Sequence, residues 1–317
     1  MKKSYFCLTL SAGMLLTMLL SGCFMFIAPE KSVSAIPGGD PATYYHLRDN
    51  DPDHCMQIFL PERPASSAHC PAVVIFPGGA YGVLAFEKEG VAYAKFLNQH
   101  GVAGIVVKYP LGSFLGGWRR HPEMQDAARR SIRLIRYHAA ALGIDPARIG
   151  TMGSSAGGHL AAHAALGKTD GDPASADPVE RVSARPDFVI MCYPVVSMGE
   201  YAHAMSRKNL LGSDPPQELV HAVSIQHQVT PSFPPVFLWF TLEDEKVDPE
   251  NGKLMDAALK KHGVPHRTMI CQKGPHGMGL LDGKQAEAYP ETAKWRHEMI
   301  AFLREQKILS PEEGVLK

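Results

Sequence analysis

The chain has 317 residues, and its Lys and Arg residues equal its Asp and Glu residues at 32 each, so the formal net charge is zero. No long run of like charge occurs, which excludes the electrostatic footprint of a nucleic-acid-binding protein or of a protein that docks on an anionic membrane surface. The length fits one large α/β domain or two smaller domains. A small neutral substrate is compatible with this charge balance.

The N-terminal segment predicts a bacterial lipoprotein signal peptide. Two lysines precede the uncharged stretch CLTLSAGMLLTMLL, and LSGC follows at residues 20–23. This ending resembles a lipobox, so we expect removal of residues 1–22, acylation of Cys23 and a lipidated tether over 23–43. The predicted location is the bacterial cell envelope, with the protein lipid-anchored and facing the periplasm or the cell surface. Ordinary secretion with an incidental cysteine is the alternative.

Four cysteines follow the predicted cleavage site. Cys192 and Cys271 lie in apolar, strand-like runs, which predicts buried thiols. Cys55 and Cys70 flank a possible hairpin, and an exported compartment permits disulfides, so a bridge between these two stays open. Neither a C-x-x-C nor an H-E-x-x-H spacing occurs, so we predict no metal site.

Short β-rich runs alternate with longer helical runs from about residue 44 onward. Strands are predicted at residues 55–61, 71–79, 101–110, 148–152, 187–196, 235–240 and 266–273. Helices are predicted at residues 85–101, 122–143, 158–167, from 249, and at 291–306. This alternation predicts one doubly wound α/β domain over residues 44–309, with a mostly parallel central sheet flanked by helices, and a tail at 310–317.

Two segments interrupt this alternation. Residues 168–186 are polar and rich in turn formers, so they predict a surface loop. Residues 197–235 form an insert between two predicted strands, and inserts of this size usually cover or border a functional site.

The segment GSSAG at residues 153–157 matches G-x-S-x-G. A predicted strand precedes it and a predicted helix follows, which is the context of a nucleophile on a strained strand-to-helix turn. Gly153 and Gly157 are small where the backbones of strand and helix must approach closely. We therefore predict Ser155 as the nucleophile. A structural loop is the alternative, because small residues are common before helices.

The segment PGGAY at residues 77–81 ends an earlier buried strand. It is comparable to the HGGG loop whose amides complete the oxyanion hole of esterases, although Pro77 replaces the histidine and Ala80 the third glycine. We predict that the amides of Gly79, Ala80 and Ala156 form the oxyanion hole. A plain strand-terminating turn is the alternative.

A serine nucleophile needs a histidine to take its proton and a carboxylate to orient that histidine. His276 lies in a glycine-rich loop after the last predicted strand, where the histidine of this chain order is expected. Of the acidic residues after the preceding strand, Asp244 is placed to turn toward His276. Asp248 is the second candidate, but its position before Pro249 is typical of a helix N-cap.

Between about Ala72 and Gly279 the sequence resembles the α/β-hydrolase superfamily, and within it the small acetylesterases and acetylxylan esterases related to hormone-sensitive lipase. The resemblance rests on VVIFPGGAYGVLAFEKEG, GIDPARIGTMGSSAGGHLAA, ARPDFVIMCYPVVSM, LEDEKVDPENG and GPHGMGL. The acid loop in that group reads D-x-x-V-P-x-E-N, which aligns Asp244 with the first Asp and places Asp248 at the usual proline. The resemblance implies ester hydrolysis, often deacetylation of hemicellulose sugars, without a metal or organic cofactor.

The predicted function is that of a serine carboxylic ester hydrolase acting through Ser155, His276 and Asp244. Its expected substrates are short acyl esters, with acetyl first, of carbohydrates or small alcohols. Two alternatives stay open at this stage. One is a peptidase of the same fold, which the absence of a propeller or large cap domain disfavours; the other is an inactive carbohydrate-binding lipoprotein.

Overall fold

The central sheet contains nine strands within the residues that the computed structural model describes, which are 30–31, 43–49, 51–62, 69–167 and 169–310. Their order across the sheet is β1-β2-β3-β5-β4-β6-β7-β8-β9. The strands are β1 (Glu30–Lys31), β2 (Tyr44–Arg48), β3 (Asp51–Phe59), β4 (Cys70–Phe76), β5 (Ala103–Lys108), β6 (Ile144–Ser154), β7 (Val189–Cys192), β8 (Val236–Thr241) and β9 (His266–Cys271). The predicted signal peptide and Cys23 lie outside the described residues.

The sheet is mostly parallel, as predicted. Among the described strands, β3 alone runs antiparallel to its two neighbours, β2 and β5, and all other neighbouring pairs are parallel. Each side chain of β4, β7 and β8 is buried, which is why these strands read as continuous apolar runs without alternation. Strand β6 begins at Ile144, earlier than the strand predicted at 148–152, and its pairing with β4 shifts register between Cys70 and Ala72.

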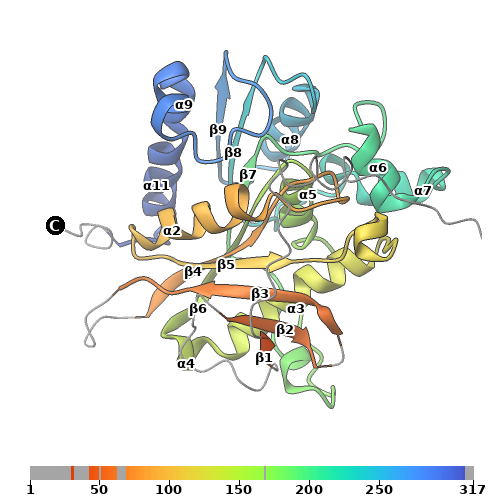
Figure 1. Cartoon of the computed structure of the whole chain (residues 1–317), viewed down its shortest axis with the longest axis vertical. Coiled ribbons are helices and arrows are strands. Elements are labelled where there is room, and N and C mark those ends of the chain that lie inside the picture. The colour runs from red at the N-terminus through yellow and green to blue at the C-terminus, as the bar shows by residue number, and fades with distance from the viewer. Residues whose placement is uncertain (1–29, 32–42, 50, 63–68, 168, 311–317) are drawn as a thin grey trace, which may run out of the picture.

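Helices flank the sheet (Figure 1). The α-helices are α2 (Ala92–Asn98), α3 (Glu123–Tyr137), α4 (Ala139–Leu142), α5 (Ala156–His163), α6 (Ala204–Leu211), α7 (Gln217–Val223), α8 (Glu250–Lys261), α9 (Gly283–Ala288), α10 (Pro290–Ala293) and α11 (Trp295–Glu305). A π-helical turn, η2 (Glu87–Val91), leads into α2, and 3₁₀ turns lie at η3 (Phe114–Gly116), η4 (Pro178–Arg181) and η5 (Ile225–His227). Within the described ranges no helix is long and apolar enough to cross a membrane.

The helix predicted over 122–143 is two helices. His138 has a non-helical ψ of 9° and ends α3, and α4 then ends at Gly143, which adopts a left-handed φ of 64°. The final helix is likewise divided into α10 and α11. Such boundaries depend on one residue's backbone angles, which the apolar spacing does not encode.

A disulfide between Cys55 and Cys70 is excluded by the sheet register. Cys55 pairs with Lys108 at the end of β5, whereas Cys70 precedes Ala72, which pairs with Ala103 at the start of β5. The length of β5 therefore separates them by roughly 15 Å along the strands, and a disulfide requires Cα atoms within about 7 Å. Both residues are buried, as are Cys192 and Cys271.

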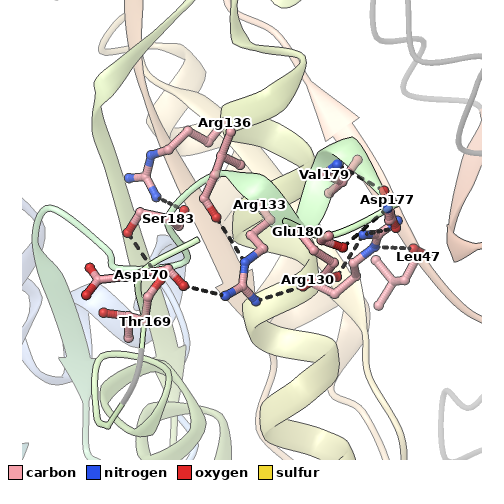
Figure 2. A network of polar contacts seen from close by, with 12 residues as sticks. Leu47, Arg130, Arg133, Arg136, Thr169, Asp170, Asp177, Val179, Glu180 and Ser183 are labelled. Carbon is pink, nitrogen blue, oxygen red and sulfur yellow. Dashed lines mark hydrogen bonds and ion pairs between the residues drawn. The ribbon is translucent and has the colours of Figure 1, made fainter. Parts of the chain in front are cut away.

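The predicted surface loop after α5 is held against α3 by a row of arginines on that helix (Figure 2). Arg130 pairs with Asp177 at 2.7 Å and with Glu180 at 2.8 Å, and its Nε donates to the carbonyl of Leu47. Arg133 and Arg136 donate to backbone carbonyls of the same loop. We refer to Arg130, Arg133, Arg136 and these partners as the arginine cluster. It fixes the loop without any of the predicted site residues.

Candidate active site

Ser155 occupies a strained turn between β6 and α5. Its φ of 54° and ψ of −123° are rare for a residue with a side chain, and such strain concentrates at functional sites. The flanking glycines are required by close backbone approach: a Cβ on Gly153 would lie 2.0 Å from the carbonyl oxygen of Gly157. A Cβ on Gly157 would lie 2.0 Å from the carbonyl oxygen of Phe76. The glycine spacing of the motif therefore follows from packing.

The structure brings Ser155, His276 and Asp244 into one chain of hydrogen bonds. The Nε2 atom of His276 lies 2.9 Å from the Oγ atom of Ser155, and its Nδ1 atom lies 2.6 Å from Oδ2 of Asp244. When Nδ1 carries the proton and donates it to the carboxylate, Nε2 is left as an acceptor for the serine hydroxyl. This arrangement can activate a hydroxyl as a nucleophile.

Asp244 is fixed by its own backbone turn. Its Oδ1 atom accepts hydrogen bonds from the amides of Lys246 and Val247, at 2.9 and 3.0 Å, and its side chain is buried. The other oxygen is thereby aimed at His276. Asp248 is exposed, and its Oδ1 accepts from the amide of Glu250 at the start of α8. The structure thus separates the two carboxylates that sequence reasoning considered.

The loop after β4 has an unusual backbone. Gly79, Ala80 and Tyr81 all have positive φ angles, of 136°, 55° and 57°. The carbonyl oxygen of Gly79 accepts from the amides of Gly82 and Val83, and that of Ala80 accepts from the Nδ2 atom of a helix α6 asparagine at 2.8 Å. Two non-glycine residues in this conformation persist because these contacts hold them there.

The predicted oxyanion-hole amides come from two segments, the start of α5 and the loop after β4. Ala156 is the first residue of α5, so its N–H lacks an acceptor within the helix. In the part of the chain that the structure describes, the amides of Gly79 and Ala80 have no hydrogen-bond acceptor, whereas that of Gly78 donates to Glu89 at 2.9 Å. The amides of Gly79, Ala80 and Tyr81 therefore remain for an incoming oxygen, and the first two of these are the ones that the sequence predicted.

These groups meet at the point where the strand order reverses. The chain passes from β4 to β5 on one side and then crosses to β6 on the other side of β4. The loop of Gly79 follows β4, and Ser155 follows β6. Open α/β sheets bind ligands at such a position, outside the carboxyl ends of the strands.

The insert between β7 and β8 borders the site, as expected for its size. Asn209 of α6 contacts the loop of Ala80 through the hydrogen bond described above. His203, which precedes α6, lies close enough to His276 for a charge on His276 to change the pKa of His203. Burial lowers the pKa of His203, and positive charge on His276 lowers it further.

Sequence reasoning missed a buried carboxyl behind the site. Glu89 in η2 is only 4% exposed, and its Oε1 atom accepts from the hydroxyl of Tyr193 at 2.8 Å. A signal was present, because Glu89 precedes Tyr93 and Leu97 by four and eight residues and so lies on the apolar face of the predicted helix.

Among the described residues, no group of three or more His, Cys, Asp or Glu side chains is arranged to hold a metal ion.

The sequence profile of the BD-FAE family matches residues 56–259. Endo-1,4-beta-xylanase B of Butyrivibrio fibrisolvens is 32% identical over 213 residues, which cover 66% of this chain and 33% of that protein. Acetylxylan esterase of Xylanibacter ruminicola is 32% identical over 230 residues, which cover 71% of this chain and 44% of that protein. The chain thus matches less than half of the length of either relative.

The solved structures that resemble this chain include an acetyl ester-xyloside bifunctional hydrolase from Caldicellulosiruptor lactoaceticus. It superposes with a TM-score of 0.78 at 35% identity, covering 87% of this chain and 99% of that chain. An esterase from Thermogutta terrifontis, Est2, superposes with a TM-score of 0.69 at 24% identity over 87% of this chain and 97% of that chain. The Est2 likeness supports the α/β fold described above.

Proposed function

Since the chain belongs to the BD-FAE family of α/β-hydrolase esterases, we propose that it is a serine carboxylic ester hydrolase that removes acetyl and other short acyl groups from carbohydrates or small alcohols. The observation that carries this proposal is the hydrogen-bonded chain from Ser155 through His276 to Asp244. The names of the acetylxylan esterase and of the acetyl ester-xyloside hydrolase support the acyl group and the carbohydrate.

In the proposed mechanism, the Oγ atom of Ser155 attacks the ester carbonyl while Nε2 of His276 takes its proton. Asp244 holds the imidazole in the required tautomer and stabilises its positive charge. The carbonyl oxygen becomes negative and accepts hydrogen bonds from Ala156 and from Gly79 or Ala80. His276 then returns the proton to the leaving alcohol, and water cleaves the acyl-enzyme by the same steps.

The first test is hydrolysis of p-nitrophenyl acetate by the purified protein. We expect Ser155→Ala to lower kcat by at least about 10⁴-fold, because no other group replaces the nucleophile. Ser131→Ala is a matched control, since this buried hydroxyl on α3 donates only to the carbonyl of Ala128. An active Ser155→Ala variant would exclude Ser155 as the nucleophile.

The natural substrate requires a separate test. Acetate release from acetylated xylan, acetylated pectin and acetylated peptidoglycan fragments should be compared under the same conditions. Release from xylan above the other two would support a hemicellulose substrate. Release from none of them, with p-nitrophenyl acetate hydrolysed, would limit the proposal to small-alcohol esters.

We also propose that the protein is a lipid-anchored protein of the bacterial envelope. The support is the N-terminal sequence alone, in which a lipobox-like LSGC ends at Cys23. Growth with a labelled fatty acid should label the wild type and the Cys7→Ser variant but not the Cys23→Ser variant. Equal labelling of all three would contradict the anchor.

A further inference from the structure

Glu89 contacts two different parts of the site through its two carboxyl oxygens. Oε2 accepts from the amide of Gly78 at 2.9 Å, and Oε1 accepts from the hydroxyl of Tyr193 at 2.8 Å. No cationic side chain forms an ion pair with Glu89 in the described part of the chain. The fit is close, because a Cβ on Gly78 would lie 2.4 Å from Oε2.

Tyr193 extends this contact to the histidine loop. Its hydroxyl accepts from the amide of Gly279, three residues after His276, at 2.9 Å. Its ring also meets the ring of His276 edge to face, with centroids 5.1 Å apart. Tyr193 follows β7 directly and has a φ of 36°, so its position depends on a strained backbone. The carboxyl of Glu89 and the hydroxyl of Tyr193 thus connect the loop that contains Gly78 and Gly79 with the loop that carries His276.

Burial of the Glu89 carboxyl disfavours its charged form, because the charge loses its contact with water. Burial raises the pKa of Glu89, and the hydrogen bonds from Tyr193 and Gly78 and the charge of His276 offset this only in part. An apolar side chain would remove the desolvation cost but would leave the amide of Gly78 buried without an acceptor. Packing alone therefore does not explain a carboxyl at this position, whereas its hydrogen bonds with Gly78 and Tyr193 do.

We infer that Glu89 and Tyr193 form a positioning unit. The unit fixes the position of the loop that carries Gly78 and the predicted oxyanion amides relative to the loop that carries His276 and Gly279. This inference rests on the proposed ester hydrolysis. Gly78 immediately precedes the predicted oxyanion amides, so loss of its acceptor lets those amides move away from the oxyanion. The oxyanion forms only when Ser155 or water attacks the carbonyl and is absent from the bound ester, so kcat should fall while KM changes little.

The test compares Glu89→Ala, Glu89→Gln and Tyr193→Phe with the wild type. We expect Glu89→Ala to lower kcat for p-nitrophenyl acetate by about 10²-fold, close to the effect of losing one oxyanion donor, with KM within about threefold. Glu89→Gln should recover most of the loss, because its amide oxygen can accept from Gly78 and its NH₂ group can donate to Tyr193. The double variant Glu89→Ala/Tyr193→Phe should lose little more than Glu89→Ala, because both changes break one unit.

A matched control separates positioning from general destabilisation. Asn98 ends the same helical segment, and its Nδ2 atom donates to the carbonyls of Phe59 and Val102, both at 2.9 Å. Asn98→Ala should lower Tm but leave kcat per active site unchanged. If Glu89→Ala does not fold, Glu89→Gln and Tyr193→Phe decide the question.

The rate of labelling of Ser155 by a fluorophosphonate gives a second readout that needs no ester substrate. It should fall in Glu89→Ala and Tyr193→Phe but not in Asn98→Ala. A wild type that is labelled but hydrolyses no ester would contradict the proposed function and leave this comparison intact. Wild-type kcat and labelling rates in Glu89→Ala or Tyr193→Phe, or equal losses in Asn98→Ala, would overturn the positioning role.

Discussion

The polar groups around Ser155 and the arginine cluster on α3 differ in how their charges are compensated. Around Ser155, side chains are linked mainly by single directed hydrogen bonds, such as those that His276 makes with Ser155 and with Asp244. In the arginine cluster, each guanidinium meets a carboxylate that is partly open to solvent, as in the pairing of Arg130 with Asp177 and Glu180. The first arrangement fixes the geometry that the proposed reaction needs, and the second holds a loop against α3.

The largest expected contrast between these regions comes from Asp244→Asn. The amide would donate toward Nδ1 of His276 and stabilise the wrong tautomer, so we expect kcat for p-nitrophenyl acetate to fall by about 10⁴-fold. The fold should persist, because the side chain volume is unchanged. Steady-state kinetics together with thermal unfolding would test this. A variant within tenfold of wild-type kcat would show that Asp244 does not orient His276.

A second contrast is the response of the site region to acid. His159 of α5 accepts from the hydroxyl of Tyr81 in the tautomer that donates from Nε2 to the carbonyl of Val223. Burial lowers the pKa of His159 to about 4, against about 6.5 in an unfolded chain. Between these values the unfolded chain binds a proton that the folded protein does not, so the folded state loses stability as pH falls below about 6.5.

The expected loss at pH 5 is about 2 kcal/mol from His159. Urea unfolding at pH 7.5 and pH 5 would measure it, with His159→Gln as the comparison, because glutamine keeps a donor and an acceptor but does not titrate. The difference in unfolding free energy between the two pH values should be smaller in the variant. The same pH dependence in both proteins would exclude His159 as the titrating group.

The arginine cluster should respond to substitution in stability alone. Arg130→Met removes two ion pairs and the hydrogen bond to Leu47, and solvent exposure of both carboxylates limits the expected loss to about 1–2 kcal/mol of unfolding free energy. Added salt should destabilise the wild type more than the variant.

Arg119→Met is the control for this prediction, because the ion pair of Arg119 with Glu123 is exposed on both sides. It should cost no more than about 0.5 kcal/mol. Kcat per active site should be unchanged in both variants. A large loss of kcat in Arg130→Met would mean that the loop fastened by the cluster reaches the site.

The sequence was most informative where one local rule determined several residues. A strand, a strained turn and a helix with glycines at both flanks located Ser155, and chain order then indicated His276. The choice between Asp244 and Asp248 needed the resemblance, because both carboxylates follow the same strand. The antiparallel direction of β3 had no local signal, since strand direction depends on pairing with distant segments.

The burial of Glu89 and its contact with Tyr193 were not predicted from the sequence. A glutamate on a predicted amphipathic helix is normally assigned to the solvent face, although its spacing from Tyr93 and Leu97 indicated the buried face. Its partner Tyr193 lies 104 residues later, and no spacing rule connects them. Polar contacts between distant segments become visible only when the sheet has placed its loops side by side.

A further small effect tests the comparison most directly, because it concerns the second carboxylate of the acid loop. Asp248→Ala removes the acceptor for the amide of Glu250 at the start of α8, so we expect a loss of about 1 kcal/mol or less in unfolding free energy. Kcat should stay at the wild-type value, since the carboxyl of Asp248 is exposed and makes no contact with His276. Kinetics and urea unfolding of Asp244→Asn and Asp248→Ala side by side would separate a carboxylate used for chemistry from one used for folding. A loss of kcat in Asp248→Ala comparable to that in Asp244→Asn would show that the acid loop rearranges before the reaction.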